Sequence, residues 1–231
     1  MTAPYYSDDQ ITIYHGDCRE ILPTLEPVDL ILTDPPYGIG YQSNNRVEQF
    51  ALIVGDDTPN VCVEGLAAAL KVLRKNRHLY AFGRYDFSSL PLADSVELIW
   101  DKGGLGKGNL SITFSTTHEY IQFAAYVPSK ANRKRGDGRL AARMRRGSVL
   151  KYPRITAGAN KRHPTEKPVP LLRELIESSS LFGETVLDPF MGVGSTLIAA
   201  SLEGRKAIGI EIEEQYCEVA VQRLRTFHDA K

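Results

Sequence analysis

The chain has 231 residues, with 28 basic and 28 acidic side chains and a formal net charge of zero at pH 7. This length suits one domain with an ample core, and neither an apolar run of the roughly 20 residues needed to span a membrane nor a signal-like start is present, so we expect a cytoplasmic protein. The three cysteines, Cys18, Cys62 and Cys217, are widely separated and form no metal-ligand cluster, so neither a disulfide nor a metal site is predicted.

Short apolar runs alternate with segments of helical periodicity along the whole chain. Strands are expected at 11–14, 28–33, 79–83, 96–100, 119–126, 185–187 and 207–210, and helices at 19–25, 61–74, 86–93, 169–181, 195–202 and 213–227. Strands 96–100 and 119–126 follow each other without a helix between them, so they should pair antiparallel. The pattern predicts a single α/β domain over 1–231, built on a doubly wound, mostly parallel, seven-stranded Rossmann-like sheet with one antiparallel hairpin.

The first candidate site follows the apolar run at 28–33. Asp34 stands where open α/β sheets place their chemistry, just past the carboxyl end of a buried parallel strand. Pro35 and Pro36 stiffen the turn and leave its carbonyls pointing outward as unpaired acceptors. A carboxylate, a free carbonyl and the ring of Tyr37 suit a planar heterocycle that carries an exocyclic amino group. A Pro-Pro turn that merely ends the strand is the simpler alternative.

A strongly basic segment comes next in the chain. Between Lys130 and His163 there are twelve basic residues and the single acid Asp137, so this segment carries a charge of about +11 and the remainder about −11. Because the segment is internal, we favour a surface that contacts nucleic-acid phosphates over a solvated tail, and we expect 127–160 to be a short basic recognition insertion. The candidate DNA-binding residues are Lys130, Arg133, Lys134, Arg135, Arg139, Arg143, Arg145 and Arg146. So small a module facing DNA usually works as a symmetric dimer.

Two further segments are suited to binding a small molecule. His163, Thr165 and Lys167 precede a helix, where a hydroxyl, an ammonium and free amides together make a carboxylate site; Thr165 could instead cap the helix, and His163 could be structural. The loop 188–195 joins a strand to a helix and has glycines that allow a ligand to approach the backbone closely. Glu211 ends the next strand, where an acid can accept both hydroxyls of a ribose.

These segments carry a resemblance to a known family. The tetrapeptide Asp34 to Tyr37 resembles the catalytic motif of the amino-methylating DNA methyltransferases, which use S-adenosylmethionine. Segment 186–196 is similar to the cofactor motif of that family, and 163–168 resembles the element that precedes this motif when the catalytic half comes first. The resemblance extends from Gly16 to the helix after Glu211 and is weakest between about 127 and 160.

The resemblance implies roles for individual residues. The catalytic residues would be Asp34, Pro35, Pro36 and Tyr37, and the cofactor would contact Asp17, Cys18, Asp34, His163, Thr165, Lys167, Asp188, Pro189, Phe190, Gly192, Gly194, Ser195, Thr196 and Glu211. Asp188 to Thr196 would surround the methionine part, Glu211 would bind the ribose, and Asp17 with Cys18 the adenine, although ordinary packing explains Cys18 equally well. Family members whose motif begins with Asp usually methylate adenine N6, so adenine is expected as the target and cytosine N4 is the alternative.

The expected reaction is direct methyl transfer to a base that has left the stack of double-stranded DNA. No covalent enzyme intermediate is needed, in agreement with the absence of a Pro-Cys pair from the chain. Other functions stay open on sequence alone: a nicotinamide-dependent oxidoreductase, disfavoured because the six-residue glycine fingerprint is incomplete; a silent DNA-binding protein; and a methyltransferase acting on RNA or protein glutamine. Whether a restriction endonuclease accompanies the protein is also left open.

Overall fold

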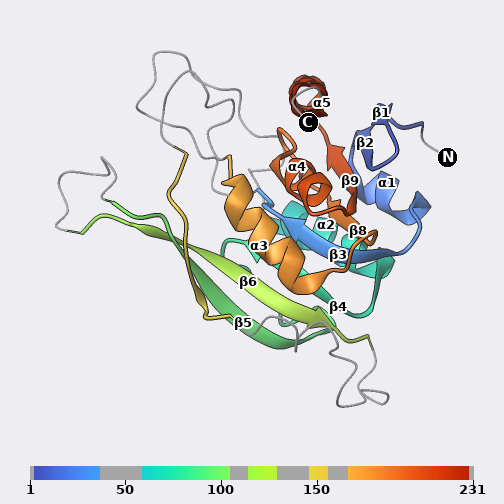
Figure 1. Ribbon diagram of the computed structural model, residues 1–231. Helices are drawn as coiled ribbons and strands as arrows, with labels where there is room; N and C mark the ends of the chain where they lie inside the picture. Colours follow the sequence, from blue (N-terminus) through green and yellow to red (C-terminus); the bar gives the residue numbers. More distant parts are fainter. Residues whose placement is uncertain (1–2, 37–58, 105–113, 129–145, 156–165, 229–231) are drawn as a thin grey trace.

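A computed structural model describes residues 3–36, 59–104, 114–128, 146–155 and 166–228 (Figure 1). Within these residues the chain forms one nine-stranded sheet in the order β1-β2-β9-β8-β3-β4-β6-β5-β7. The strands are β1 (Tyr6–Ser7), β2 (Ile11–His15), β3 (Val28–Thr33), β4 (Leu73–Phe82), β5 (Leu92–Asp101), β6 (His118–Tyr126), β7 (Val149–Lys151), β8 (Thr185–Asp188) and β9 (Lys206–Glu211).

The strands β2, β9, β8, β3 and β4 are neighbours in the sheet and run parallel to one another. Strand β3 lies in the middle, and all six of its residues are buried, as expected for an apolar run covered on both faces. Leu30 and Leu32 join the core on one face of the sheet, whereas Ile31 joins the core on the other. The predicted doubly wound arrangement is therefore present in this part of the sheet.

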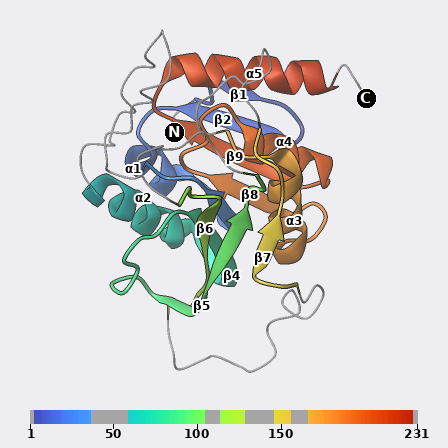
Figure 2. The same cartoon turned by 90° about the vertical axis from the view of Figure 1, so that its left-hand side faces the viewer.

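The helices cover the two faces of the sheet. They are α1 (Cys18–Ile21), the short 3-10 helix η1 (Leu22–Thr24), α2 (Pro59–Val72), α3 (Val169–Ser179), α4 (Ser195–Leu202) and α5 (Glu214–His228). Apolar side chains of α3, α4 and α5 share one core with the sheet, and those of α1, η1 and α2 share the other. Figure 2 shows α1 and α2 on one side of the strands and α3 and α4 on the opposite side.

The remaining strands differ from the predicted sheet in number and in direction. Nine strands are present where seven were predicted, because β1 and β7 have only two and three residues and are too short to show a periodicity. Strands β5 and β6 pair antiparallel as predicted, but β4 with β6 and β1 with β2 are antiparallel too, so the expectation of a single antiparallel hairpin is wrong.

The predicted helix at 86–93 is also wrong, since this segment forms a turn followed by the start of β5. The Asp86 carboxylate accepts a hydrogen bond from the Ser88 amide at 2.9 Å, a local bond that competes with helix formation. Pro91 then disfavours a helical conformation for the residue before it. The strand that follows begins at Leu92 and is ten residues long, about twice the expected length.

Candidate active site and cofactor site

The carboxyl ends of the parallel strands meet along one edge of the sheet. Asp34 follows the last residue of β3, Asp188 ends β8, and Glu211 ends β9. Strand β6 runs antiparallel to β4, with Ile121 opposite Phe82, so β6 brings its first residues to this same edge. The edge therefore gathers the predicted acids together with residues from the start of β6.

Asp34 lies in a compact group of charged side chains. The Lys167 ammonium is 2.5 Å from Oδ2 of Asp34 and 3.5 Å from Oε2 of Glu119, near the start of β6. Lys167 is only 7% exposed, and its ammonium also lies 4.9 Å from the centre of the Phe82 ring. Burial alone would lower the pKa of Lys167, but the two carboxylates outweigh it and raise the pKa above its ordinary value. Lys167 is thus a buried, protonated partner of the predicted catalytic acid.

This geometry gives the candidate catalytic motif two partners that the sequence did not predict. Lys167, assigned by resemblance to the cofactor's carboxylate, is paired here with Asp34. The Pro35 carbonyl, expected to be unpaired, accepts a hydrogen bond from the Tyr85 hydroxyl at 3.0 Å, and that expectation is wrong. A carbonyl oxygen has a second lone pair, so Pro35 can still accept from a substrate. Pro36 follows in the described chain, and Tyr37 lies outside it.

Asp188 joins the predicted cofactor loop to the strand that carries Asp34. Its Oδ1 accepts hydrogen bonds from the Thr33 hydroxyl at 2.7 Å and from the Phe190 amide at 3.2 Å. Burial raises the pKa of Asp188 to about 6, although hydrogen bonds from Thr196 and Thr33 oppose that rise. The two predicted acids are therefore held next to each other through the end of β3.

The glycines of the cofactor loop adopt conformations that other residues rarely take. Gly192 has a φ of 51°, and a Cβ atom there would meet nothing within 4 Å, so this part of the backbone borders open space. Gly194 has a φ of 76° and is the N-cap of α4, and a Cβ atom there would lie 3.0 Å from Ala220 of α5. The loop thus offers backbone groups and a helix amino terminus to a ligand, while at Gly194 it packs closely against α5.

Glu211 is a buried carboxylate at the end of β9. It accepts hydrogen bonds from the amides of Gly192 and Glu213, both at 2.9 Å. Burial raises the pKa of Glu211 to about 7, against the opposing effect of these amide bonds. Each carboxylate oxygen keeps a further acceptor position, so the side chain is still suited to a pair of ribose hydroxyls.

The predicted adenine site lies between α1, α2 and the cofactor loop. The Cys18 thiol and the Phe190 ring meet at Gly65, where a Cβ atom would stand 3.2 Å from the sulfur and 2.6 Å from the ring. Asp17 caps α1 and pairs with Arg19 at 2.6 Å. The structure therefore brings Cys18 and Phe190 together, although they are far apart in sequence.

A clamp between three segments was not predicted from the sequence. Arg223 of α5 donates to the Val193 carbonyl at 2.6 Å and to the Ser195 hydroxyl at 3.2 Å, and it also pairs with Glu166. It thereby ties the cofactor loop to the residue before Lys167. An arginine within the periodic pattern of a terminal helix reads as a surface residue, so the sequence held no signal for this contact.

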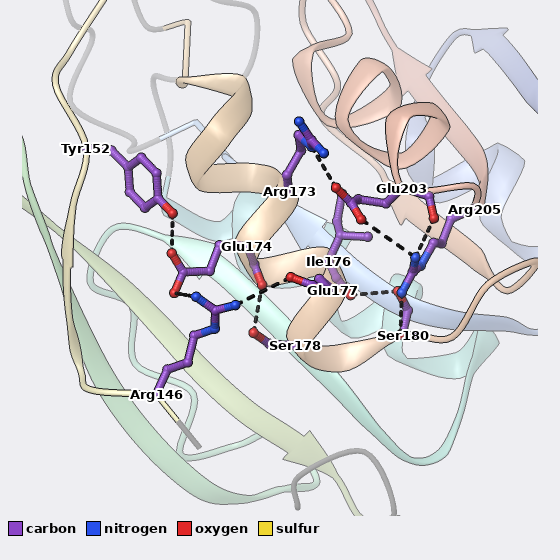
Figure 3. A network of polar contacts seen from close by, with 10 residues as sticks. All are labelled: Arg146, Tyr152, Arg173, Glu174, Ile176, Glu177, Ser178, Ser180, Glu203 and Arg205. Atoms are coloured by element: carbon purple, nitrogen blue, oxygen red, sulfur yellow. Dashed lines mark hydrogen bonds and ion pairs between the residues drawn. The ribbon is translucent and has the colours of Figure 1, made fainter. Parts of the chain in front are cut away.

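Of the candidate DNA-binding residues, the structure describes only Arg146. Its guanidinium pairs with Glu174 at 2.9 Å and Glu177 at 3.4 Å, both on α3, and the hydroxyl of Tyr152, the residue after β7, donates to Glu174 (Figure 3). The other side of α3 carries a separate pair, Arg173 with Glu203 (Figure 3). Arg146 is thus engaged with carboxylates of its own chain.

Several predicted site residues lie outside the described part of the chain. They are Tyr37, Lys130, Arg133, Lys134, Arg135, Arg139, Arg143, Arg145, His163 and Thr165. Their proposed roles stay predictions. Described residues of the expected cofactor site, in contrast, gather at one edge of the sheet, with Pro189 and Thr196 both buried there.

Comparison with known proteins decides the family. The model of a DNA methylase family that covers N6 and N4 enzymes matches residues 28–222. The chain belongs to this family. The Escherichia coli K12 protein named "Putative methylase YubD" is 35% identical over 220 residues, covering 90% of this chain and 88% of YubD. Family membership favours the methyltransferase interpretation over the oxidoreductase.

Two solved structures show the same fold. The M1.HpyAVI complex with S-adenosylmethionine has a TM-score of 0.66 at 24% identity and covers 93% of this chain and 98% of its own. The cytosine-N4-specific PvuII DNA methyltransferase has a TM-score of 0.72 at 14% identity and covers 95% of this chain and 88% of its own. These likenesses show the fold, and membership of the N6/N4 DNA methylase family identifies the chain as an S-adenosylmethionine-dependent amino-methyltransferase of DNA.

The described residues fit that cofactor. The loop at Gly192 borders open space, a helix amino terminus follows it, and Asp188 and Glu211 add two buried carboxylates, as a ligand with amino and hydroxyl groups requires.

Among the residues that the structure describes, no helix is long and apolar enough to cross a membrane.

Proposed function

We propose that the protein transfers a methyl group from S-adenosylmethionine to the exocyclic N6 of adenine in duplex DNA. The observation that supports this most is the juxtaposition of Asp34 and the Pro35 carbonyl with Asp188. The Thr33 hydroxyl bonds Asp188 at 2.7 Å, so the acceptors for a substrate adjoin the strand that opens the cofactor loop. Both partners of a transfer reaction would then meet at the ends of β3 and β8.

In this proposal Asp34 and Pro35 act on the amino nitrogen of the base. That nitrogen is a poor nucleophile because its lone pair is delocalised into the ring. By accepting its protons, the carboxylate and the carbonyl favour a pyramidal nitrogen and stabilise the positive charge that develops on it. The cofactor would supply the methyl group and leave as its thioether, and the nitrogen would give up one proton, for which Asp34 is the adjacent acceptor. Tyr37 would stack on the base.

The cofactor would be held by the residues at the carboxyl ends of β8 and β9. When bound, it supplies the electrophilic methyl group. Asp188 and the loop to Thr196 would bind its methionine part, Glu211 its ribose, and Asp17, Cys18 and Phe190 would border its adenine. Thr165 and His163 would receive its carboxylate, because Lys167 is already paired with Asp34.

The base would have to leave the duplex to reach Asp34, at a cost of a few kcal/mol that the pocket and stacking must offset. We propose that the basic insertion contacts the DNA phosphates, and that the protein works in the cytoplasm, with a symmetric dimer as the expected assembly. Sedimentation with and without a short duplex would test the dimer.

Adenine is proposed as the target because Asp34 begins the catalytic motif. Cytosine N4 is the second candidate, since the family contains enzymes of both kinds and the fold is shared with a cytosine-N4 enzyme. The two bases present the same kind of amino group, so the acceptors at Asp34 and Pro35 suit either.

Sequencing with modified-base detection on the DNA of an expressing host tests the proposal. The expected result is N6-methyladenine at a defined sequence in cells that carry the wild-type protein and its absence from cells that carry Asp34→Ala. N4-methylcytosine in its place would reassign the target base. DNA without any modification would contradict the proposed function.

A further inference from the structure

Lys167 creates a difficulty for the proposed reaction. Its ammonium lies 2.5 Å from Oδ2 of Asp34, the carboxylate that has to accept a proton of the incoming amino group. A buried ammonium that loses its carboxylate partner is strongly destabilised. Lys167 therefore either competes with the base for Asp34 or needs another carboxylate close by.

Glu119 is that second carboxylate. Its Oε2 lies 3.5 Å from the Lys167 ammonium, within the range of an ion pair but too long for a strong hydrogen bond. This oxygen is buried and has no hydrogen-bond partner among the described residues. A small movement of the ammonium from Asp34 toward Glu119 would give Oε2 the bond it lacks.

The opposite oxygen of Glu119 is held in place from the other side. Lys102, which follows β5, lies 3.3 Å from Oε1 of Glu119. The four side chains Lys102, Glu119, Lys167 and Asp34 thus alternate in sign, with two positive and two negative charges. Exchange of partners along this row needs no proton transfer and creates no new charge in the buried site, because the Lys167 ammonium stays paired with a carboxylate throughout.

We propose that Glu119 is a positioning residue for methyl transfer, which takes over Lys167 when the amino group of the target base engages Asp34. The inference rests on the proposed function and adds a residue to its machinery. Glu119 lies outside all the motifs of the sequence and reaches the site from the start of an antiparallel strand. Among the described residues, the groups that face Lys167 include Asp34 after β3, Glu119 on β6 and the Phe82 ring on β4, and Asp34 in turn interacts electrostatically with Asp188 of β8.

The test is a kinetic comparison of Glu119→Gln with Glu97→Gln. The second variant removes a carboxylate of the neighbouring strand β5 that pairs with Arg84. With unmethylated genomic DNA, Glu119→Gln should lower kcat by about tenfold, because Lys167 then holds Asp34 against the base, while the KM for S-adenosylmethionine changes by less than about twofold. Glu97→Gln should leave both constants unchanged. An unchanged kcat in Glu119→Gln would overturn the inference.

A thermal-unfolding cycle tests the pairing without any methyl acceptor. Glu119→Gln should lower the Tm of the wild-type protein but raise the Tm of Lys167→Met, where Glu119 and Asp34 would be two neighbouring carboxylates without their shared cation. Equal shifts in both backgrounds would mean that Glu119 is merely structural and would contradict the inference. If Glu119→Gln does not fold, Glu119→Asp keeps the charge, shortens the reach and should show a smaller loss of kcat.

The two measurements distinguish a failure of the proposed function from a failure of the role proposed for Glu119. A wild-type protein that methylates no DNA overturns the proposed function and with it the role of Glu119, whatever the cycle shows. A wild-type protein that methylates DNA, combined with a Glu119→Gln variant of full kcat, overturns only the inference.

Discussion

The parallel part of the sheet and its antiparallel extension contribute to the site in different ways. Strands β3, β8 and β9 place Asp34, Asp188 and Glu211 just where their carboxyl ends meet. Glu119 of β6 pairs with Lys167, and Lys102, which follows β5, pairs with Glu119; neither residue belongs to a motif. In the proposed reaction the first part would supply acceptors for the two reactants, and the second part would supply the charges that determine how Asp34 is paired.

The contrast follows from strand direction. In a parallel sheet every strand brings its last residues to the functional edge, so the chemistry follows an apolar run and can be found in the sequence. An antiparallel strand brings its first residues to that edge instead. Glu119 therefore precedes the apolar residues of β6, where a search at strand ends does not find it.

The largest expected effect comes from replacing the two acids of the parallel part, Asp34 and Asp188, one at a time. Asp34→Ala should reduce methyl transfer by at least about a hundredfold and leave cofactor binding intact, because its acceptors act on the nitrogen that receives the methyl group. Asp188→Ala should instead abolish cofactor binding. Calorimetry with S-adenosylmethionine measures both, and the reverse assignment of the two variants would contradict this division.

Replacing Arg223 tests whether the conformation of the cofactor loop depends on contacts with α5. Arg223→Met removes the donor to Val193 and Ser195 and leaves Glu166 buried without its cation, so the free energy of unfolding should fall by about 2 kcal/mol. Cofactor affinity should fall as well. Adding Glu166→Gln to Arg223→Met should restore part of the stability in urea unfolding, and a purely additive double variant would show that the pair is not coupled.

Glu211 should make the stability of the folded protein depend on pH. Burial raises its pKa to about 7, above the ordinary value of 4.5. Between those values the folded protein binds a proton that the unfolded chain has lost, so the contribution of Glu211 to stability grows as the pH falls from about 7 toward about 4.5. Glu211→Gln should flatten the dependence of Tm on pH over this window. The exposed Glu218→Gln serves as a control, and identical slopes in all three proteins would contradict the prediction.

The smallest expected effect concerns the basic insertion. Neutralising Arg143 and Arg145 should weaken binding to specific and random duplexes alike and flatten the slope of log affinity against log salt by about 0.9 for each lost phosphate contact. Arg146→Gln should change the slope less, because Glu174 and Glu177 already pair with Arg146. Fluorescence titrations across salt concentrations measure both. Unchanged slopes would identify the insertion as a solvated loop.

Much of the fold was predictable because buried parallel strands and amphipathic helices have strong periodicities. All seven expected strands occur, and the acids at the ends of β3, β8 and β9 were found by the same reasoning. The edge strands β1 and β7 were missed because two or three residues carry no periodicity. The helix expected at 86–93 failed because the Asp86 side chain closes a turn and Pro91 follows it.

Contacts that join distant segments were beyond prediction from one sequence. Lys167 was expected to face the cofactor, yet it pairs with an acid 133 positions earlier in the chain. The clamp at Arg223 and the charge row through Glu119 likewise depend on how α5 and β6 pack, which local patterns do not encode. A charged residue in an otherwise periodic segment looks the same whether it meets water or a buried partner.

The central claim is tested most directly by the fate of tritium from methyl-labelled S-adenosylmethionine incubated with unmethylated duplex DNA. The wild-type protein should transfer the label, and hydrolysis of the DNA should release it as N6-methyladenine, while Asp34→Ala should transfer at most about one hundredth as much. Label recovered only as N4-methylcytosine would contradict the choice of base. Absence of label from the DNA would contradict the account as a whole.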